Sequence, residues 1–414
     1  MRNLSRCITA IIITILFLQC GQSPVDPSNQ PPRALSTGET QLVDSGNRFG
    51  FKLFKGIVQN QPDSNIFISP LSVSMALGMV YNGANGSTRE AMDSTLEFNG
   101  LDIQQVNESY RSLIDLLINL DPVVVFQIAN SIWYRLGFPV DPDFLDLNRT
   151  YFDAEVSELD FSDPMAADII NSWVDENTNG KITEIIQPPI SPLTVMFLIN
   201  AIYFLGDWTY QFDEDSTYDA MFDLPDGSQS ACRMMTQENN FKYFENDDFQ
   251  AIDLPYGNGL FSMTIFLPGS QADIDALIDD LNQENWISWM DSFIEQQLIV
   301  HLPKFRFKWE NSLNNVLKAL GMEIAFDMDS ADFSGMIDPE SPIEDGLYIS
   351  KVKHKTFIEV DEEGTEAAAV TSVEIRFISL PQDMLINRPF IFMIRENHSQ
   401  TVLFMGKIVE PVWQ

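Results

Sequence analysis

The sequence predicts an α+β fold in which helices come first and antiparallel strands come later. Two observations carry this prediction. Early segments such as 42–60 place apolar residues at helical spacing, whereas the second half of the chain alternates short apolar runs with turns. In addition, hydrophobic residues make up 45% of the chain and include 30 Phe, so the chain can build a large folded core.

The first elements follow from apolar periodicity and from the residues that break it. Phe49, Leu53 and Ile57 share one face of the first helix. The next helix is apolar nearly all round, so we expect it to be buried. Gly83 and Gly86 separate it from the following helix. The expected elements are a helix over Leu42–Asn60, a strand over Asn65–Ser69, a helix over Pro70–Val80 and a helix over Ser87–Leu96.

Strands of a large sheet are expected next, with one helix between them. Val123–Arg135 is the first of these strands, and a helix starts at Asp163-Pro164 and ends at Gly180. Thr194–Leu205 is a nearly continuous apolar run with Asn200 in its middle, and we expect a central strand buried on both faces. The later elements are strands over 250–255, 260–267, 297–307, 347–360, 390–396 and 402–409, and a helix over 312–320.

The charge of the chain excludes some classes of partner. The 414 residues include 24 Lys+Arg and 60 Asp+Glu, and 24 − 60 gives a net charge of −36. Nucleic acid is therefore not expected as a partner, because binding phosphates requires basic patches. Docking on anionic lipid is disfavoured for the same reason. The length alone suggests two or three domains, and a single large α+β domain is also compatible with it.

The N-terminus has the pattern of an export signal. Residues 8–18 are apolar for eleven residues, which is too short for a membrane span of about 20. Cys20 follows, and the segment resembles a bacterial lipoprotein signal in which this Cys carries the lipid, although Gln19 replaces the usual small residue. Plain secretion and a retained anchor stay open. We therefore expect a signal peptide over 1–20, a flexible Pro- and Ser-rich tether over 21–41 and a folded domain over 42–414.

Cysteine usage agrees with export without disulfides. Cys7 lies in the signal, Cys20 would carry lipid, and Cys232 alone remains in the folded domain. We expect Cys232 to be a buried small hydrophobic residue. The protein would lie on the outer surface or in the periplasm when lipid-anchored, or outside the cell when secreted. Lipid would then be its only link to a membrane.

No motif of an enzyme or of a cofactor site occurs in the sequence. The signatures of serine hydrolases, zinc proteases, redox dithiols and dinucleotide binding are all missing. His301, His354 and His398 are too far apart in sequence to suggest a metal site. We therefore expect a protein that is not an enzyme and that needs no cofactor or metal.

Residues 362–381 have an unusual pattern for their place in the chain. A strand leads into Glu362-Glu363-Gly364, after which small residues accumulate. Every second residue from Thr365 to Ile375 is small or apolar, which is the period of a strand with one buried face. The segment then ends in residues 376–381, which are typical of an exposed, protease-accessible stretch. A pattern of this kind indicates two states of one segment.

With these motifs the sequence is similar to the serpin family over about residues 42–414. The matching blocks occur in the family's order and are 65–92, 170–182, 198–208, 301–305, 360–369 and 387–411. The resemblance implies a domain of three β-sheets and about nine helices with an exposed reactive loop. It also implies a suicide inhibitor of serine proteases, with cross-reaction to papain-like cysteine proteases. In that family a protease cleaves the loop and is trapped as an acyl-enzyme when the loop inserts into a sheet. We expect a monomer.

The hinge of the loop decides between an inhibitor and a non-inhibitory binding protein of the same family. Insertion needs side chains that pass between two strands without a clash, and a Pro or a charge at alternate positions would stop it. The small residues at these positions therefore favour an inhibitor, and a binding or scaffold protein stays open as the alternative. The hinge residues implied by the resemblance are Glu362, Glu363, Gly364, Thr365, Glu366, Ala367, Ala368 and Ala369.

The resemblance also implies where the protease cuts. The family places the scissile bond 378 − 364 = 14 residues after the hinge glycine, which gives Ile378–Ser379. Ile378 is apolar and suits an elastase-like or subtilisin-like protease. A shift of one residue would present Phe377 to a chymotrypsin-like protease, and a shift of two would present Arg376.

Two further groups of residues are implied by matching positions. Ser69, Ser72, Asn200 and His354 correspond to the polar cluster, called the shutter, under the point where the sheet opens, and we expect them to form one hydrogen-bond network. Trp208, Lys304 and Glu362 correspond to the breach, where insertion begins, with an ion pair between Lys304 and Glu362.

Overall fold

Helix α1 (Thr37–Asn60) opens the folded part of the computed structural model, which describes residues 32–269, 273–342, 346–364 and 382–414. Ser36 and Glu39 form a reciprocal capping box, so the helix begins at Thr37 rather than at the expected Leu42. Ala34–Gln414 form one compact unit. None of the helices in the described ranges is long and apolar enough to cross a bilayer.

Eight further α-helices follow α1 in the described residues, and α2, α4, α8 and α9 pack against it. The sequence predicts α2 and α3 closely, because Ser69 caps α2 ahead of Pro70. It does not predict α4, α5, α7 or α8. The bounds are α2 (Pro70–Tyr81), α3 (Gly86–Thr95), α4 (Ile103–Ile118), α5 (Pro142–Phe152), α6 (Ala166–Asn177), α7 (Ile274–Asp280), α8 (Gln283–Ser292) and α9 (Asn314–Leu317).

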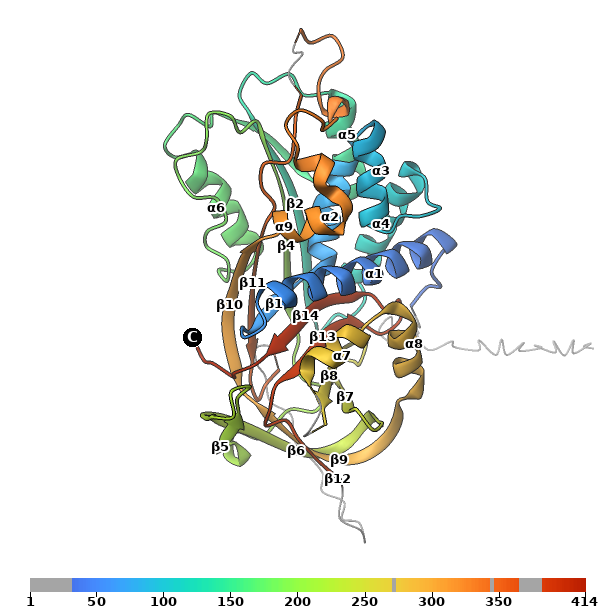
Figure 1. Cartoon of the computed structure of the whole chain (residues 1–414), viewed down its shortest axis with the longest axis vertical. Helices are drawn as coiled ribbons and strands as arrows, with labels where there is room; N and C mark the ends of the chain where they lie inside the picture. The colour runs from blue at the N-terminus through green and yellow to red at the C-terminus, as the bar shows by residue number, and fades with distance from the viewer. Residues whose placement is uncertain (1–31, 270–272, 343–345, 365–381) are drawn as a thin grey trace, which may run out of the picture. The chain divides into compact units, whose positions relative to one another are not determined.

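The largest sheet has nine strands and lies beneath α1, α7 and α8 in Figure 1. Its order is β1-β14-β13-β8-β7-β6-β9-β12, with β5 paired to β6. All the pairings are antiparallel except that of β12 with β9. The strands are β1 (Ile66–Ile68), β5 (Tyr218–Asp223), β6 (Gln229–Glu245), β7 (Phe249–Tyr256), β8 (Phe261–Pro268), β9 (Ile294–Pro303), β12 (Gln382–Leu385), β13 (Phe390–Glu396) and β14 (Val402–Ile408).

Two smaller sheets stand beside each other. One has three strands in the order β3-β2-β4, and the other consists of β10 and β11. Their strands are β2 (Val125–Arg135), β3 (Glu155–Leu159), β4 (Met196–Leu205), β10 (Phe305–Ser312) and β11 (Lys353–Val360). The described residues thus contain nine α-helices and three sheets, which confirms the expected α+β architecture.

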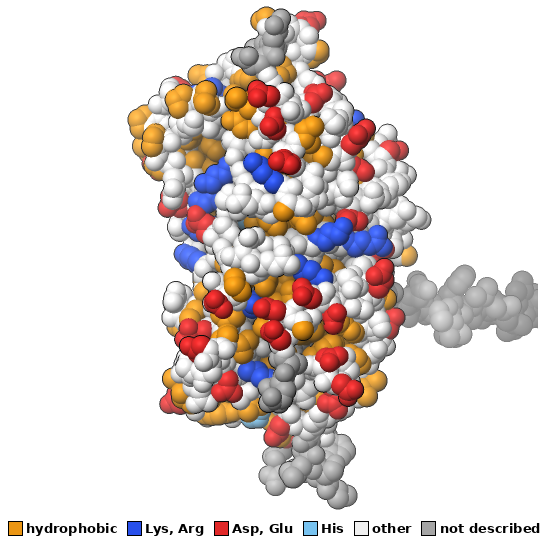
Figure 2. Space-filling model, viewed as in Figure 1, with side chains coloured by type: hydrophobic (Ala, Val, Ile, Leu, Met, Phe, Trp, Pro, Cys, Tyr) orange, Lys and Arg blue, Asp and Glu red, His pale blue; other side chains and the backbone are white. Residues whose placement is uncertain are grey.

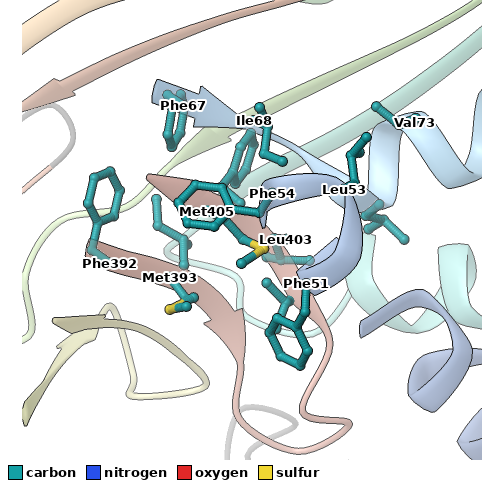
Figure 3. Close-up of a cluster of buried hydrophobic side chains, with 14 of the residues drawn as sticks. Phe51, Leu53, Phe54, Phe67, Ile68, Val73, Phe392, Met393, Leu403 and Met405 are labelled. Carbon is teal, nitrogen blue, oxygen red and sulfur yellow. The ribbon is translucent and has the colours of Figure 1, made fainter. Parts of the chain in front are cut away.

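The main core lies between α1, α2 and the strands β1, β13 and β14 (Figure 3). Phe51 and Phe54 of α1 point into this cluster together with Phe67 of β1, and all three are at most 2% exposed. Phe67 stacks on Phe404 of β14 with ring centroids 5.1 Å apart. These contacts join the N-terminal helices to the C-terminal strands, so the core closes only when both ends of the domain have folded.

Strand β4 differs from its prediction. The expected strand was central and buried on both faces, but β4 is the last strand of its sheet and pairs only with β2 among the described strands. Its burial alternates: Ile199, Ala201 and Tyr203 are buried, whereas Leu198 and Ile202 are partly exposed. Helices α2 and α6 both pack against β4, and the residues of the strand also line a cavity along its free edge.

Candidate functional site

A slot runs between the two smaller sheets. β4 pairs with β2 on one side only, and β11 pairs with β10 on one side only, in the part of the chain that the structure describes. Both free edges border the same cavity of about 690 Å³, which residues 196–205 and 347–359 line along their length. An unpaired strand edge presents rows of N–H and C=O groups that can bond to another strand. The slot therefore offers two such edges to one extended segment.

The two strands run in the same direction along the slot. Their carboxyl ends meet, because Asp207 just after β4 forms a bridge with Gly364 just after β11. Chain that continues beyond Gly364 into the slot would therefore reverse its direction and lie antiparallel to both strands. Antiparallel pairing on both sides would satisfy the two edges at once.

Gly364 is required where the two chain segments cross. Its φ is +134°, a conformation that residues with a side chain rarely adopt. A Cβ at this position would lie 2.5 Å from the Gly206 carbonyl oxygen and 2.6 Å from the Asp207 Cα. Backbone would therefore have to move to admit any side chain, and the close approach of β11 to the end of β4 depends on this glycine.

The breach residues lie together at this crossing. The Trp208 backbone N–H donates to the Glu363 carbonyl and its indole N–H donates to the Asp361 carbonyl, both at 3.0 Å. Lys304 forms the expected ion pair with Glu362, which also accepts a 2.7 Å hydrogen bond from the Thr217 hydroxyl.

The side chain of Glu362 is only 6% exposed. Burial raises the pKa of this carboxyl, but the hydrogen bonds from Lys304 and Thr217 outweigh burial and hold the pKa below its ordinary value. Glu362 is therefore ionised at neutral pH, and its ion pair with Lys304 is much less exposed to solvent than an ordinary surface salt bridge.

Three of the four shutter residues form one network. The Ser69 backbone N–H donates to His354 Nε2 at 2.9 Å, and the Ser69 hydroxyl accepts the Ser72 N–H at 3.2 Å and donates to the Leu403 carbonyl at 2.8 Å. Burial lowers the pKa of His354 to about 4, so the imidazole is neutral at pH 7 and Nε2 is free to accept.

Asn200 lies in the same cavity but outside that network. Its side-chain amide donates to Asn130 Oδ1 at 2.8 Å, because β2 and β4 place Asn130 and Asn200 directly opposite each other. Its own Oδ1 is buried and has no hydrogen-bond partner among the described residues. Since a buried unpaired acceptor is costly, this oxygen is a natural partner for a donor that enters the slot.

The loop after α6 crosses the slot. α6 packs on β2 and β4, whereas Lys181, just beyond its end, reaches β11. The Lys181 ammonium lies 5.1 Å from the centre of the Phe357 ring and 3.9 Å from Glu359. Lys355 donates back to the Glu184 carbonyl at 3.0 Å. A segment that enters between β4 and β11 must displace these contacts.

Several predicted residues lie outside the described residues. These are the hinge residues Thr365, Glu366, Ala367, Ala368 and Ala369, the reactive positions Arg376, Phe377, Ile378 and Ser379, and the lipidation site Cys20. Cys232 of β6 is described: it is 8% exposed, as expected of a small hydrophobic residue, and burial raises the pKa of its thiol. No group of three His, Cys, Asp or Glu side chains in the described ranges could hold a metal ion.

Some contributors to the site were not anticipated from the sequence. Asp361 acts through its backbone carbonyl, for which a residue type carries no signal. Glu363, which was predicted as a hinge residue, also contributes through its backbone carbonyl. Trp413 near the C-terminus lies over both Lys304 and Arg306, with cation-to-ring distances of 5.1 and 4.9 Å. Asn130 could have been found, because it is a polar residue in the middle of an apolar strand, as Asn200 is.

Comparisons with known proteins agree with this geometry. The family model described as Serpin (serine protease inhibitor) matches residues 44–411. Human neuroserpin is 32% identical over 92% of this chain and 94% of its own length, and the leukocyte elastase inhibitor of Xenopus tropicalis is 34% identical over 89% and 99%.

Solved structures of the same family superimpose on the chain. The thermophilic serpin tengpin in its native state has a TM-score of 0.81 at 30% identity and covers 92% of this chain and 96% of its own. Human thyroxine-binding globulin, solved in complex with thyroxine, has a TM-score of 0.81 at 28% identity and covers 91% of this chain and 100% of its own. On the matched residues and on the fold, the chain belongs to the serpin family.

Proposed function

We propose that the protein is a suicide-substrate inhibitor of serine endopeptidases with elastase-, subtilisin- or chymotrypsin-like specificity. The observation that carries this proposal is the slot between β4 and β11, which has two free strand edges and leads directly from Gly364. A sheet with an unfilled strand position beside a segment patterned as a strand is a metastable arrangement. Cleavage of that segment would release it to fill the position.

The chemistry is that of an interrupted acyl transfer. The protease serine Oγ attacks the carbonyl carbon of Ile378, the bond to the Ser379 nitrogen breaks, and the new amine leaves with the proton. The ester to Ile378 remains on the protease until water attacks it. If residues 365–376 enter the slot first, they carry the ester about 40 Å at about 3.3 Å per residue. The distorted protease then no longer hydrolyses the ester.

The identity of the first cleaved residue sets the class of protease. Ile378 is β-branched and apolar, and it favours an elastase- or subtilisin-like pocket. Phe377 or Arg376 would become the cleaved position in a shifted register, and papain-like cysteine proteases would be trapped by the same movement as a thioester. We propose that the free protein is a monomer, so that one chain consumes one protease.

The alternative is a binding protein on the same frame, as the similarity to thyroxine-binding globulin illustrates. The two candidate functions make different demands on the slot between β4 and β11. A binding protein can keep an open slot without filling it, whereas an inhibitor must fill it after cleavage. The small side chains at Thr365, Ala367 and Ala369 favour filling, because they would pass between β4 and β11 without a clash.

We also propose that the protein is exported and tethered through lipid on Cys20. Growth of an expressing bacterium with labelled palmitate tests this proposal. Label that is present in the wild type and missing from Cys20→Ser supports the anchor. Unlabelled protein in the culture medium would indicate plain secretion.

The inhibitory proposal is tested by mixing the mature chain with a panel containing an elastase, a subtilisin, a chymotrypsin and a trypsin. We expect a band of the combined mass that survives hot detergent, and a released C-terminal peptide that begins at Ser379 by mass spectrometry. Complete cleavage of the loop without such a band, by every protease that cuts it, would contradict the proposal. A peptide beginning at another residue would correct the register only.

A further inference from the structure

Two uncharged loops lie side by side where β2 ends and β4 begins. Residues 136–140 (LGFPV) follow β2, and residues 185–195 (IIQPPISPLTV) precede β4. The Arg135 guanidinium, at the end of β2, donates to the carbonyls of Ser191 and Thr194 at 2.9 and 2.8 Å. Arg135 therefore ties the second loop to the start of the first. We call the two loops together the uncharged tip.

The uncharged tip is open to solvent although it is rich in apolar surface. Leu193 is 85% exposed and Leu136 is 58% exposed, and Pro188, Pro189 and Pro192 are exposed beside them. Charged residues make up 20% of the chain, so 16 positions would hold about three charges at the average frequency, whereas the tip holds none. Figure 2 shows hydrophobic side chains gathered at the upper left of the molecule. An exposed patch of this kind marks an interaction site.

The tip lies at the end of the domain away from the hinge. β4 begins at Met196, next to the tip, and ends at Leu205, just before the crossing at Gly364. Its ten residues span about 30 Å at about 3.3 Å per residue. Figure 1 shows the loops beyond α6 at the upper end of the view and β12 at its lower end. A partner held at the tip therefore stays away from the two points between which the predicted reactive loop runs in sequence.

The charges that border the tip are mostly carboxylates. Asp141 follows the first loop, and Glu184 precedes the second. Glu158 accepts the Gly137 N–H at 2.8 Å, and Arg135 is the cation that hydrogen-bonds to the tip. This border and the net charge of −36 repel an anionic lipid surface. A zwitterionic bilayer is complementary instead, because its outermost cations can face the carboxylates while apolar side chains enter between the headgroups.

The predicted tether would bring the domain to a bilayer without fixing its orientation. Cys20 and Ser36, which caps α1, are 16 residues apart, and 16 residues span at most about 55 Å. A domain on such a tether can turn different faces to the lipid, so its own surface decides which face stays there. The tether also keeps the tip at a high effective concentration near the lipid, so a contact that is weak by itself becomes occupied.

We propose that the uncharged tip enters the surface of a zwitterionic bilayer and holds the lipid-tethered domain with its hinge end away from the membrane. This proposal rests on the proposed lipid tether and deepens it, because it adds a second membrane contact to the lipid on Cys20. Leu193 is the expected anchor, since it is the most exposed large hydrophobic side chain in the described residues. Removing such a side chain from water is favourable, whereas removing a carboxylate is not.

The test holds the protein on a bilayer without using the lipid on Cys20. The mature chain 21–414 contains the whole compact unit Ala34–Gln414, and an N-terminal histidine tag binds it to phosphatidylcholine vesicles that carry a nickel-chelating lipid. An environment-sensitive nitrobenzoxadiazole dye on Leu193→Cys reports entry into lipid, and Cys232 is too buried to take the dye. Emission should rise at least about twofold on the vesicles and should be quenched by spin-labelled lipid. The same dye on Ile287→Cys of α8, which is 48% exposed outside the tip, should not respond.

A charge in the neighbouring loop checks that the apolar surface causes the response. Leu136→Asp should lower the fraction of tips in the lipid at least about tenfold, because a carboxylate must then leave water with the tip. Ile287→Asp should leave that fraction unchanged. Equal emission of the Leu193 dye on and off the vesicles, or an undiminished response in Leu136→Asp, would overturn the proposal. A response that follows protein concentration without vesicles would assign the tip to a second copy of the chain and would overturn it as well.

Failure of the proposed lipid tether gives a different result. If palmitate is not incorporated through Cys20, the histidine-tagged chain still reports on the tip, because its attachment does not depend on that residue. A Leu193 signal on the vesicles would then support the tip alone, and no signal would overturn it.

Discussion

A charge introduced on one side of the hinge should convert the inhibitor into a substrate. Ala369 belongs to the alternate set predicted to face inward, and Ala368 belongs to the outward set. The inner side of the slot is formed by Thr356 and Ile358 of β11, which are 5% and 3% exposed. Ala369→Asp would bring a carboxylate against this buried surface, whereas Ala368→Asp would leave its carboxylate in solvent.

The size of the effect follows from the cost of burying an unpaired charge. An uncompensated buried charge costs about 3–5 kcal/mol in proteins. Each 1.36 kcal/mol added to an activation barrier slows the step tenfold. If the whole cost of burying the charge adds to the barrier of insertion, insertion would slow roughly 100- to 5,000-fold. Hydrolysis of the ester would then overtake insertion. Because the carboxyl can also be neutralised, lowering the pH from 7 to 5 should restore part of the inhibition.

The assay counts the inhibitor molecules consumed per protease molecule inactivated. We expect a ratio near one for the wild type and for Ala368→Asp, and a ratio at least about tenfold higher for Ala369→Asp at pH 7. Loop cleavage should be equally fast in all three. Ratios that are raised equally in the two Asp variants would refute the assignment of faces. Ratios near one in both variants would refute insertion between β4 and β11 as the trapping step.

Three other perturbations test the breach, the shutter and the bridge over the slot. Glu362→Gln should lower the free energy of unfolding by about 1.5–3 kcal/mol at pH 7. The pKa of Glu362 is lowered in the fold, so its contribution is present above about pH 4.5 and is lost below, and wild type and variant should converge near pH 3 in denaturant titrations. Burial lowers the pKa of His354 to about 4, so the unfolded chain takes up a proton first as the pH falls below 6.5. Unfolding should thus become easier by roughly 3 kcal/mol between pH 7 and pH 4, and His354→Gln should remove that part of the pH dependence. Lys181→Ala should speed the insertion of a loop peptide two- to fivefold, because it removes a contact across the slot, whereas Lys308→Ala on β10 should not.

The short buried strands of the large sheet were within reach of sequence patterns, and its longest strand was not. β13 and β14 are short, fully buried apolar runs, and the sequence predicts both nearly to the residue. β6 (Gln229–Glu245) was missed although it has 17 residues. Met234 and Met235 are both buried, so its alternation changes phase in the middle, and its open face carries polar residues. A period that breaks within a strand gives no consistent signal.

The parts of the site that depend on side-chain contacts of particular residue types could be predicted from the sequence. The pair of Lys304 with Glu362 and the place of Trp208 beside it follow from motif positions, and the structure brings all three together. The sequence did not predict that Asn200 would lie outside the hydrogen-bond network of the other three shutter residues. Asn200 bonds to Asn130 rather than to the network of Ser69 and His354, because the register of β2 against β4 decides its neighbour. Register between distant strands is a tertiary property that local spacing does not contain.

The edge position of β4 was also beyond sequence reasoning. A run as apolar as Met196–Leu205 is typical of a strand covered on both faces and paired on both sides. In the proposed mechanism, the second neighbour would be the loop segment after cleavage. The composition of β4 would then match a six-stranded arrangement of β3, β2, β4, that segment, β11 and β10, of which the described residues contain the other five strands.

The most direct measurement compares the melting temperature of the intact protein with that of the protein nicked at the predicted bond Ile378–Ser379 by a small amount of protease. About a dozen new ladder bonds at about 1 kcal/mol net each would add on the order of 10 kcal/mol, or about 10–20 °C for a domain of this size. A filled slot predicts this rise, together with resistance of the nicked chain to further proteolysis. A nicked protein that melts at or below the temperature of the intact one would contradict both the insertion and the inhibitory role.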